Sequence, residues 1–192
     1  MPVITAQTLR TLLSCERRAW LDLRDDLALH AEPETPAPFA AIGRAHERAV
    51  HAVTTGPVEA ISVKSWDDGV ALTRDLMQRG VPILLGAYLE VVTPLDLTER
   101  VFTLRGRVDR LVRAPLHGAE AYFPVEIKYH AQPEDADWLQ LDFYAWLLGE
   151  IQGTAPSGEL WLGADANGAP RRRLAHEYDE ERLMAALARL LD

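Results

Sequence analysis

The chain has 192 residues and a mass of 21.4 kDa, a length that predicts one domain over residues 1–192 with room for a sizeable core. Hydrophobic residues make up 48% of the chain and charged residues 26%, which excludes disorder for most of it. The formal net charge of −9 excludes nucleic-acid binding by bulk charge alone. It does not exclude an acidic metal site that lies beside local arginines.

The cysteine count and the hydropathy pattern exclude further classes of protein. Cys15 is the single cysteine, which excludes an internal disulfide and any site built from several thiolates, so no iron–sulfur cluster is expected. We expect Cys15 to be a small buried side chain. No apolar run approaches the roughly 20 residues of a membrane helix, and the N-terminus lacks a signal-peptide core. These features predict a cytoplasmic protein with no membrane partner.

The basic residues are almost all arginine. The chain has 18 arginines and two lysines, Lys64 and Lys128. Such an imbalance usually reflects codon composition and indicates a GC-rich bacterial genome. Arginine is a planar, permanently charged fork, whereas lysine is a compact charge with a tunable pKa. A lysine that is kept in this background therefore points to a task that arginine would not serve.

Hydrophobic periodicity predicts the elements in chain order. We expect a helix over residues 5–29 with at most one break, a loop over 30–38, a helix over 39–53, a short strand over 58–63 and a helix over 66–78. Strands follow over 83–92, 101–113 and 121–129, the last two joined as an antiparallel hairpin. A helix over 135–151, strands over 159–162 and 171–176 and a helix over 178–191 complete the chain. This order predicts an α/β or α+β fold.

The predicted hairpin carries an apolar face and a charged face. If its turn centres between His117 and Gly118, Asp109 lies directly across from Glu126. Two facing carboxylates repel unless a cation or a proton lies between them, and oxygen ligands suit Mg²⁺ or Mn²⁺. Lys128 projects from the same face. The alternative is a solvated strand face with an ordinary ion pair, and a register slip of two residues would separate the acids.

Five segments together resemble a known family. In chain order they are Cys15-Glu-Arg-Arg18-Ala-Trp20-Leu21, Gly43-Arg-Ala-His46-Glu47, Arg105-Gly-Arg-Val-Asp109, Val125-Glu-Ile-Lys128 and Gln140-Leu-Asp-Phe-Tyr144. The ordered set resembles the motifs of the PD-(D/E)XK nuclease superfamily in its RecB-like branch, which includes the CRISPR-associated RecB-like exonucleases. It spans residues 15–144. The resemblance implies a restriction-endonuclease-like core, with a mixed central β-sheet flanked by helices.

The resemblance also implies a metal site. His46, Asp109 and Glu126 would bind Mg²⁺ or Mn²⁺, with the backbone carbonyl of Ile127 as a further ligand. The simpler interpretation of His46 is an ordinary polar residue on a helix.

A catalytic set follows from the same motifs. Beside the two acids, Lys128 would position or deprotonate the attacking water and help to neutralise charge at the phosphate. Gln140 and Tyr144 would contact the nucleic-acid backbone or brace the lysine. The alternative for Tyr144 is core packing with a bonded hydroxyl. The implied catalytic residues are thus Asp109, Glu126, Lys128, Gln140 and Tyr144.

Arginines near the motifs predict the nucleic-acid contacts. We expect Arg105, Arg107, Arg110 and Arg18 to contact phosphates, in a manner that is sensitive to salt and blind to sequence. Nothing resembles a base-reading motif, so DNA ends or single strands are the expected substrates. The CRISPR-associated relatives add three late cysteines that this chain lacks. No helicase motif is present, so any unwinding would come from a partner such as a helicase.

The expected function is divalent-metal-dependent hydrolysis of DNA phosphodiester bonds. We expect an exonuclease, bacterial and nucleoid-associated, that acts in DNA repair, recombination or defence. One alternative is a non-catalytic nucleic-acid-binding or scaffolding subunit with the same fold. Another is a nuclease that acts on RNA or branched DNA, and a third is an acidic interaction module in which the motifs arise by chance.

Overall fold

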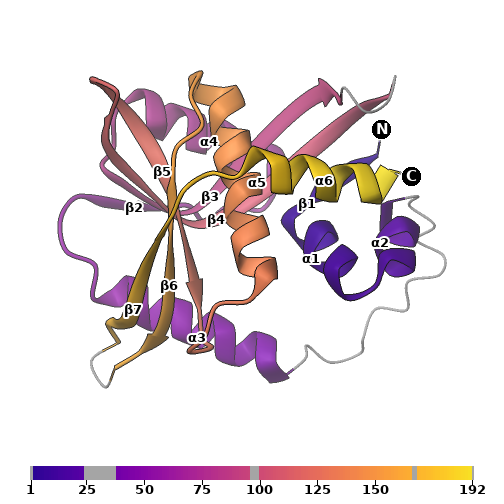
Figure 1. Ribbon diagram of the computed structural model, residues 1–192. Coiled ribbons are helices and arrows are strands. Elements are labelled where there is room, and N and C mark those ends of the chain that lie inside the picture. The colour runs from indigo at the N-terminus through magenta and orange to yellow at the C-terminus, as the bar shows by residue number, and fades with distance from the viewer. Residues whose placement is uncertain (1, 24–37, 96–99, 166–167, 192) are drawn as a thin grey trace.

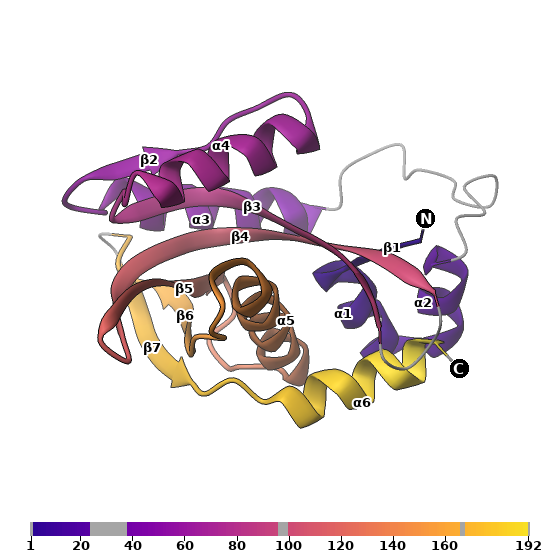
Figure 2. The same ribbon diagram turned by 90° about the horizontal axis from the view of Figure 1, so that it is seen from above.

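The computed structural model describes residues 2–23, 38–95, 100–165 and 168–191. A curled sheet wraps around helix α5, with α1 and α6 on the same side and α3 and α4 on the other side (Figures 1 and 2). The elements are β1 Val3–Thr5, α1 Ala6–Ser14, α2 Glu16–Leu23, α3 Pro38–Ala52, β2 Val58–Ala60, α4 Trp66–Gln78, β3 Ile83–Pro94, β4 Val101–Leu116, β5 Ala119–Lys128, α5 Asp135–Gln152, β6 Gly158–Ala164, β7 Pro170–His176 and α6 Glu180–Leu191.

The sheet has seven strands and mixed pairing. Its order is β2-β3-β4-β5-β6-β7, with β1 added beside β4. Strands β3, β4 and β5 are antiparallel neighbours, whereas β5 and β6 are parallel. Parallel neighbours need a crossover connection, and α5 supplies it. The mixed central sheet flanked by helices confirms the predicted fold class.

Helix α5 is central because it is apolar on nearly all sides. Its leucines and aromatic residues pack against the concave side of the sheet and against α1 and α6. A helix without a polar face must be buried, and a sheet that curls around it provides that environment. The fully buried members include Leu139, Leu141, Phe143, Leu147 and Leu148. The few polar side chains of α5 therefore lie inside the protein.

Most predicted elements are confirmed, and the differences lie near the N-terminus. The first predicted helix is two helices that break at Cys15, and a short strand, β1, precedes them because it pairs with β4. Residues 24–29 of that prediction, and all but the last residue of the predicted loop 30–38, lie outside the described residues. The expectation that Cys15 is buried is wrong, since it ends α1 as an exposed cap. Among the described helices, none is long and apolar enough to cross a membrane.

The hairpin has the predicted register. Its pairs run from Leu116 with Ala119 to Arg110 with Val125, around a turn at His117 and Gly118. One further step would oppose Asp109 and Glu126, but the pairing of β4 with β5 ends before it. The two strands therefore separate at the acids, and β5 continues beside β6.

Candidate active site

Two carboxylates face each other where β4 and β5 separate. The backbone N–H of Ile127 donates a 2.8 Å hydrogen bond to Oδ2 of Asp109, which ties this carboxylate to β5. Burial raises the pKa of Asp109 well above its ordinary value, and the charges of Glu126 and Glu47 raise it further. This position therefore disfavours two adjacent negative charges unless a cation offsets them.

One oxygen of Glu126 has two donors and the other has none. Lys128 Nζ and Gln140 Nε2 donate to Oε1 of Glu126 at 2.7 and 2.9 Å. Lys128 Nζ also donates to Oε1 of Gln140 at 2.9 Å. Oε2 of Glu126 is buried without a hydrogen-bond partner. A buried carboxylate oxygen that is left unbonded costs free energy, so a ligand at this atom would be favoured.

Tyr144 fixes the orientation of Gln140. Its hydroxyl accepts a 2.7 Å hydrogen bond from Gln140 Nε2 and donates one of 2.8 Å to the backbone carbonyl of Arg107. The ring is buried, which raises the pKa of Tyr144 well above its ordinary value and keeps the hydroxyl protonated. Gln140 thereby links α5 to Lys128 and Glu126 in one defined arrangement.

His46 reaches the same region from α3. Its side chain is buried, its ring lies edge-on to Tyr129 at 5.6 Å, and its Nε2 has no hydrogen-bond partner. Burial lowers the pKa of His46, although a hydrogen bond to the backbone of Lys128 opposes this effect. A neutral imidazole with an unbonded nitrogen is a competent metal ligand.

The donor set fits a divalent cation. Oε2 of Glu126 and Nε2 of His46 are buried without partners, and burial, with neighbouring negative charge, raises the pKa of Asp109. Carboxylate oxygens with one imidazole suit Mg²⁺ or Mn²⁺. The ligand atoms of these three side chains do not, however, form one of the tight trios within 4.8 Å found among the described residues.

The trio of side chains that meets this spacing lies in the segment between Lys128 and Gln140. It comprises His130, Glu134 and Asp137, whose ligand atoms lie within 4.8 Å of one another. Both carboxylate oxygens of Asp137 already have hydrogen-bond partners. Oδ1 accepts from Arg10 at 2.9 Å, and Oδ2 accepts from the backbone N–H of Glu134 at 2.9 Å and lies 2.8 Å from His130 Nε2. A metal in this trio would have to come between His130 and Asp137 Oδ2 and compete with the Glu134 N–H for that oxygen.

Three residues of the site lie outside the predicted set. Arg10 of α1 donates to Asp137 Oδ1 and, at 3.2 Å, to Gln140 Oε1, while Asp137 lies 3.8 Å from Lys128 Nζ. Burial alone would raise the pKa of Asp137, but these hydrogen bonds and the charge of Lys128 lower it overall. Asp137 and Gln140 are three residues apart on α5, a spacing that indicates a shared helix face. No sequence signal connects Arg10 or His130 to them.

Glu47 adds a further acid beside His46. It is half-buried, and burial raises its pKa, as does the charge of Glu126. Glu47 and Glu126 therefore disfavour each other's negative charge. The sequence motif contains Glu47, but nothing in the motif alone separates a site position from a surface one.

The four predicted phosphate-binding arginines do not form one surface. Arg105 donates to Glu90 at 2.6 Å and stacks on Trp66, and Arg107 is exposed beside Tyr88, both on the side that α4 covers. Arg18 is exposed on α2. The structure brings Arg105 and Arg107 together beneath α4, whereas Arg110 lies further along β4 beneath the end of α3 and Arg18 lies on another element.

Arg110 lies on the same side of the sheet as Arg105 and Arg107 because the strand alternation shifts beside it. The pairing of β3 with β4 skips Gly86 and Asp109, and Gly86 has a φ of 67°, which favours glycine. Val108 and Leu111 consequently face the same core although they are three residues apart. Arg110 therefore faces away from that core, on the side that α3 and α4 cover, and donates to Thr54 just beyond the end of α3.

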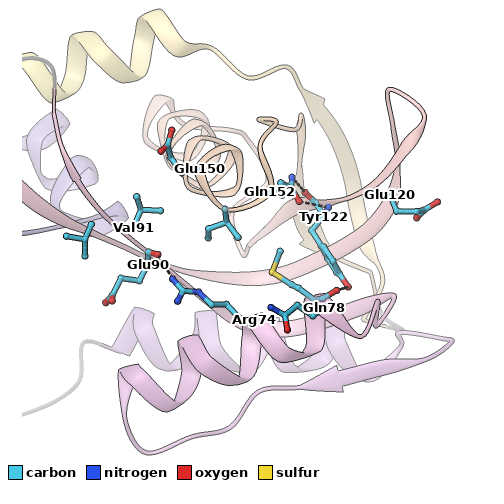
Figure 3. A pocket seen from close by; sticks show the side chains of 11 residues that line it. Arg74, Gln78, Glu90, Val91, Glu120, Tyr122, Glu150 and Gln152 are labelled. Carbon is cyan, nitrogen blue, oxygen red and sulfur yellow. Dashed lines mark hydrogen bonds between the residues drawn. The ribbon is translucent and has the colours of Figure 1, made fainter.

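A cavity of about 750 Å³ lies away from these residues (Figure 3). It is bounded by α4, β3 and the end of α5, and Glu90, Glu120 and Glu150 line it with Arg74. Three carboxylates make it unsuited to phosphate groups. None of the predicted site residues lines it.

The comparisons with known proteins agree with this geometry. The family model described as PD-(D/E)XK nuclease superfamily matches residues 3–192, and the chain therefore belongs to this superfamily. A solved structure described as "Crystal structure of SSO0001" is similar, with a TM-score of 0.54 and 16% identity, over 99% of this chain and 75% of that chain. This second likeness supports the fold alone. Comparison with curated proteins found no match. The superfamily assignment confirms the resemblance, while the RecB-like branch stays a prediction.

Proposed function

We propose that the protein is a divalent-metal-dependent nuclease that hydrolyses DNA phosphodiester bonds from ends or on single strands. The observation that carries the proposal is the pair of buried, unbonded ligand atoms, His46 Nε2 and Glu126 Oε2, at the separation of β4 and β5. Superfamily membership adds that nucleic acid is the substrate class. The Arg-rich composition favours a bacterial protein. The resemblance to RecB-like nucleases favours a cytoplasmic, nucleoid-associated enzyme of repair, recombination or defence, and the lack of a helicase motif favours a separate helicase as partner.

Four groups would hold the cation. They are the side chains of His46, Asp109 and Glu126 and the backbone carbonyl of Ile127. When bound, a divalent cation supplies positive charge at the scissile phosphate and makes water more acidic. Asp109 is kept in place by the N–H of Ile127, and Glu126 by the donors on its other oxygen.

Lys128 is the group that would act directly on the reacting atoms. Its ammonium is held between Glu126 and Gln140, where it can neutralise charge on the phosphate and orient the attacking water. Gln140 is in turn fixed by Tyr144, and Arg10 fixes both Gln140 and Asp137. The positions of these groups before substrate binds would reduce the reorganisation needed in the reaction.

Cleavage of end-labelled DNA tests the proposal. Single-stranded and duplex substrates are incubated with Mg²⁺, Mn²⁺ or EDTA, using wild type, Lys128→Ala and Asp109→Asn. Lys64→Ala is the matched control, because Lys64 is exposed and is the other lysine of the chain. We expect metal-dependent cleavage that both site variants lose by about 100-fold or more and the control keeps.

The same assay separates the alternatives. DNA binding without cleavage by wild type would favour the non-catalytic subunit with this fold. Faster cleavage of RNA or of branched DNA in a substrate panel would show that these, and not DNA ends or single strands, are the substrate class. Cleavage that persists in both site variants would contradict the assignment of the site.

A further inference from the structure

A second cavity lies on the α3 side of the sheet. It has a volume of about 730 Å³ and lies where the end of α3 meets β4, β5, β6 and β7. Its lining combines charged, hydroxyl and apolar side chains, including Thr54, Arg110, Phe123, Ser157, Trp161 and Arg173. The mixed lining suits a ligand with an anionic part and an apolar part.

Arg110 is buried in this lining without a carboxylate partner. It is 9% exposed, and one of its terminal nitrogens donates to Thr54 Oγ1 at 2.9 Å. Its Nε is buried and unbonded, and within the described part of the chain it forms no ion pair. Buried arginines are almost always paired with an acid, because an uncompensated charge is costly in the interior.

A second arginine shares the aromatic ring that supports the first. The guanidinium of Arg110 lies 4.9 Å from the Trp161 ring centroid, and that of Arg173 lies 4.1 Å from it. Glu159 is the acid in the lining, and its carboxylate accepts a 2.7 Å hydrogen bond from the indole N–H of Trp161. Burial and the charge of Arg173 lower the pKa of Arg110, although Glu159 opposes this. The cavity is thus net positive in an acidic protein.

The cavity adjoins the candidate active site. Arg110 directly follows Asp109 in β4, and its partner Val125 directly precedes Glu126 in β5. Helix α3 carries His46 at the site and Val50 in the cavity lining, four residues or roughly 6 Å along the helix. A nucleic acid at the site would therefore lie close to the cavity.

We propose that this cavity binds a phosphate group carried on a nucleotide. The planar guanidinium of Arg110, with Arg173 beside it, matches the phosphate oxygens, and Thr55 and Ser157 add hydroxyl donors. Apolar side chains such as Phe123 offer a wall for the sugar and base. The nucleotide belongs either to a strand at the active site or to a free mononucleotide. The choice of ligand class rests on the proposed nuclease function.

Calorimetric binding of deoxyadenosine 5′-monophosphate in EDTA tests this proposal without requiring cleavage. We expect the Arg110→Met variant to bind about tenfold more weakly or worse, while its thermal stability is unchanged or higher, because an unpaired buried charge has been replaced by an apolar side chain. Arg173→Gln, at an exposed position, should also weaken binding. Arg171→Gln, exposed on the same strand, is the matched control and should bind as wild type does.

The outcomes distinguish this proposal from the nuclease function. Asp109→Asn should lose cleavage but keep nucleotide binding. Tighter binding of a 5′-phosphorylated oligonucleotide than of its unphosphorylated form would assign the site to a strand end, and preference for the mononucleotide would assign it to free nucleotide. Equal affinity in wild type, Arg110→Met and Arg173→Gln would overturn the proposal, as would equal binding of inorganic phosphate and the nucleotide.

Discussion

His51 lies near the end of α3, directly after Val50, which lines the arginine-lined cavity. Its ring is half-buried and its Nε2 has no hydrogen-bond partner. Burial, followed by the charges of Arg110 and Arg107, lowers the pKa of His51 from 6.5 to about 4. The folded protein therefore keeps this imidazole neutral at a pH at which the unfolded chain protonates it.

This shift predicts a pH-dependent loss of stability. Between pH 6.5 and about 4 the unfolded state binds more protons at His51, so the free energy of unfolding falls as the pH falls through this range. His51→Gln should remove about 1 kcal/mol of that loss, after allowance for solvent screening of a half-buried ring. Urea unfolding at pH 7 and pH 5 measures the difference. Parallel pH profiles for the two proteins would contradict the assignment.

The sequence predicts the positions of some residues of the site and not of others. Asp109, Glu126 and Lys128 are predictable together because a short turn fixes the register between them. Arg10 is not predictable, because it reaches Asp137 across 127 positions and no local pattern records that contact. The expectation for Cys15 failed because its place at a helix end, and not its side-chain chemistry, decides its exposure.

Helix α5 packs on β4 so closely that a glycine is required between them. A Cβ added at Gly106 would lie 2.8 Å from Tyr144 Cε1 and 2.9 Å from Leu147 Cδ1. Tyr144 cannot move away from β4 without losing its hydrogen bonds with Gln140 and with the Arg107 carbonyl. Packing in this helix–strand pair and the orientation of Gln140 are therefore coupled.

Gly106→Ala should consequently affect stability and activity together. We expect a loss of about 1–3 kcal/mol in the free energy of unfolding, from overpacking, and a fall in the cleavage rate with unchanged metal requirement. Gly43→Ala is the control, because no atom lies within 4 Å of its added Cβ in α3. This control should gain about 0.5–1 kcal/mol. Equal stability of the Gly106 variant and wild type would show that the helix can move away from the strand.

The sequence predicts a helix or strand correctly where the residues that form it and pair with it lie close together in the chain. The β4–β5 hairpin and α4 follow from turn residues and helical periodicity. Strand β1 does not, because its three residues form a strand only through pairing with β4, about 100 positions away. The strict alternation expected for β4 also failed to place Arg110, since the shift at Gly86 lies on the neighbouring strand.

The whole molecule brings four distant segments to one point. Helix α1 supplies Arg10, α3 supplies His46, the hairpin supplies the two acids and Lys128, and α5 supplies Gln140, because the sheet curls around α5 while α3 covers its other side (Figure 2). Such a site is complete only in the folded protein. A cation that binds these groups therefore binds the folded state and not the unfolded chain.

Metal binding should accordingly raise the thermal stability. Saturating Mg²⁺ or Mn²⁺ at about 100 times its dissociation constant stabilises the folded state by about 2.7 kcal/mol, and the melting temperature in a scanning experiment should rise with the metal concentration. Glu126→Gln removes a charged ligand and should abolish the rise. Glu134→Gln is the discriminating control, because Glu134 belongs to the trio with His130 and Asp137 and is exposed. A rise that survives Glu126→Gln and disappears in Glu134→Gln would place the cation at the trio of His130, Glu134 and Asp137 instead.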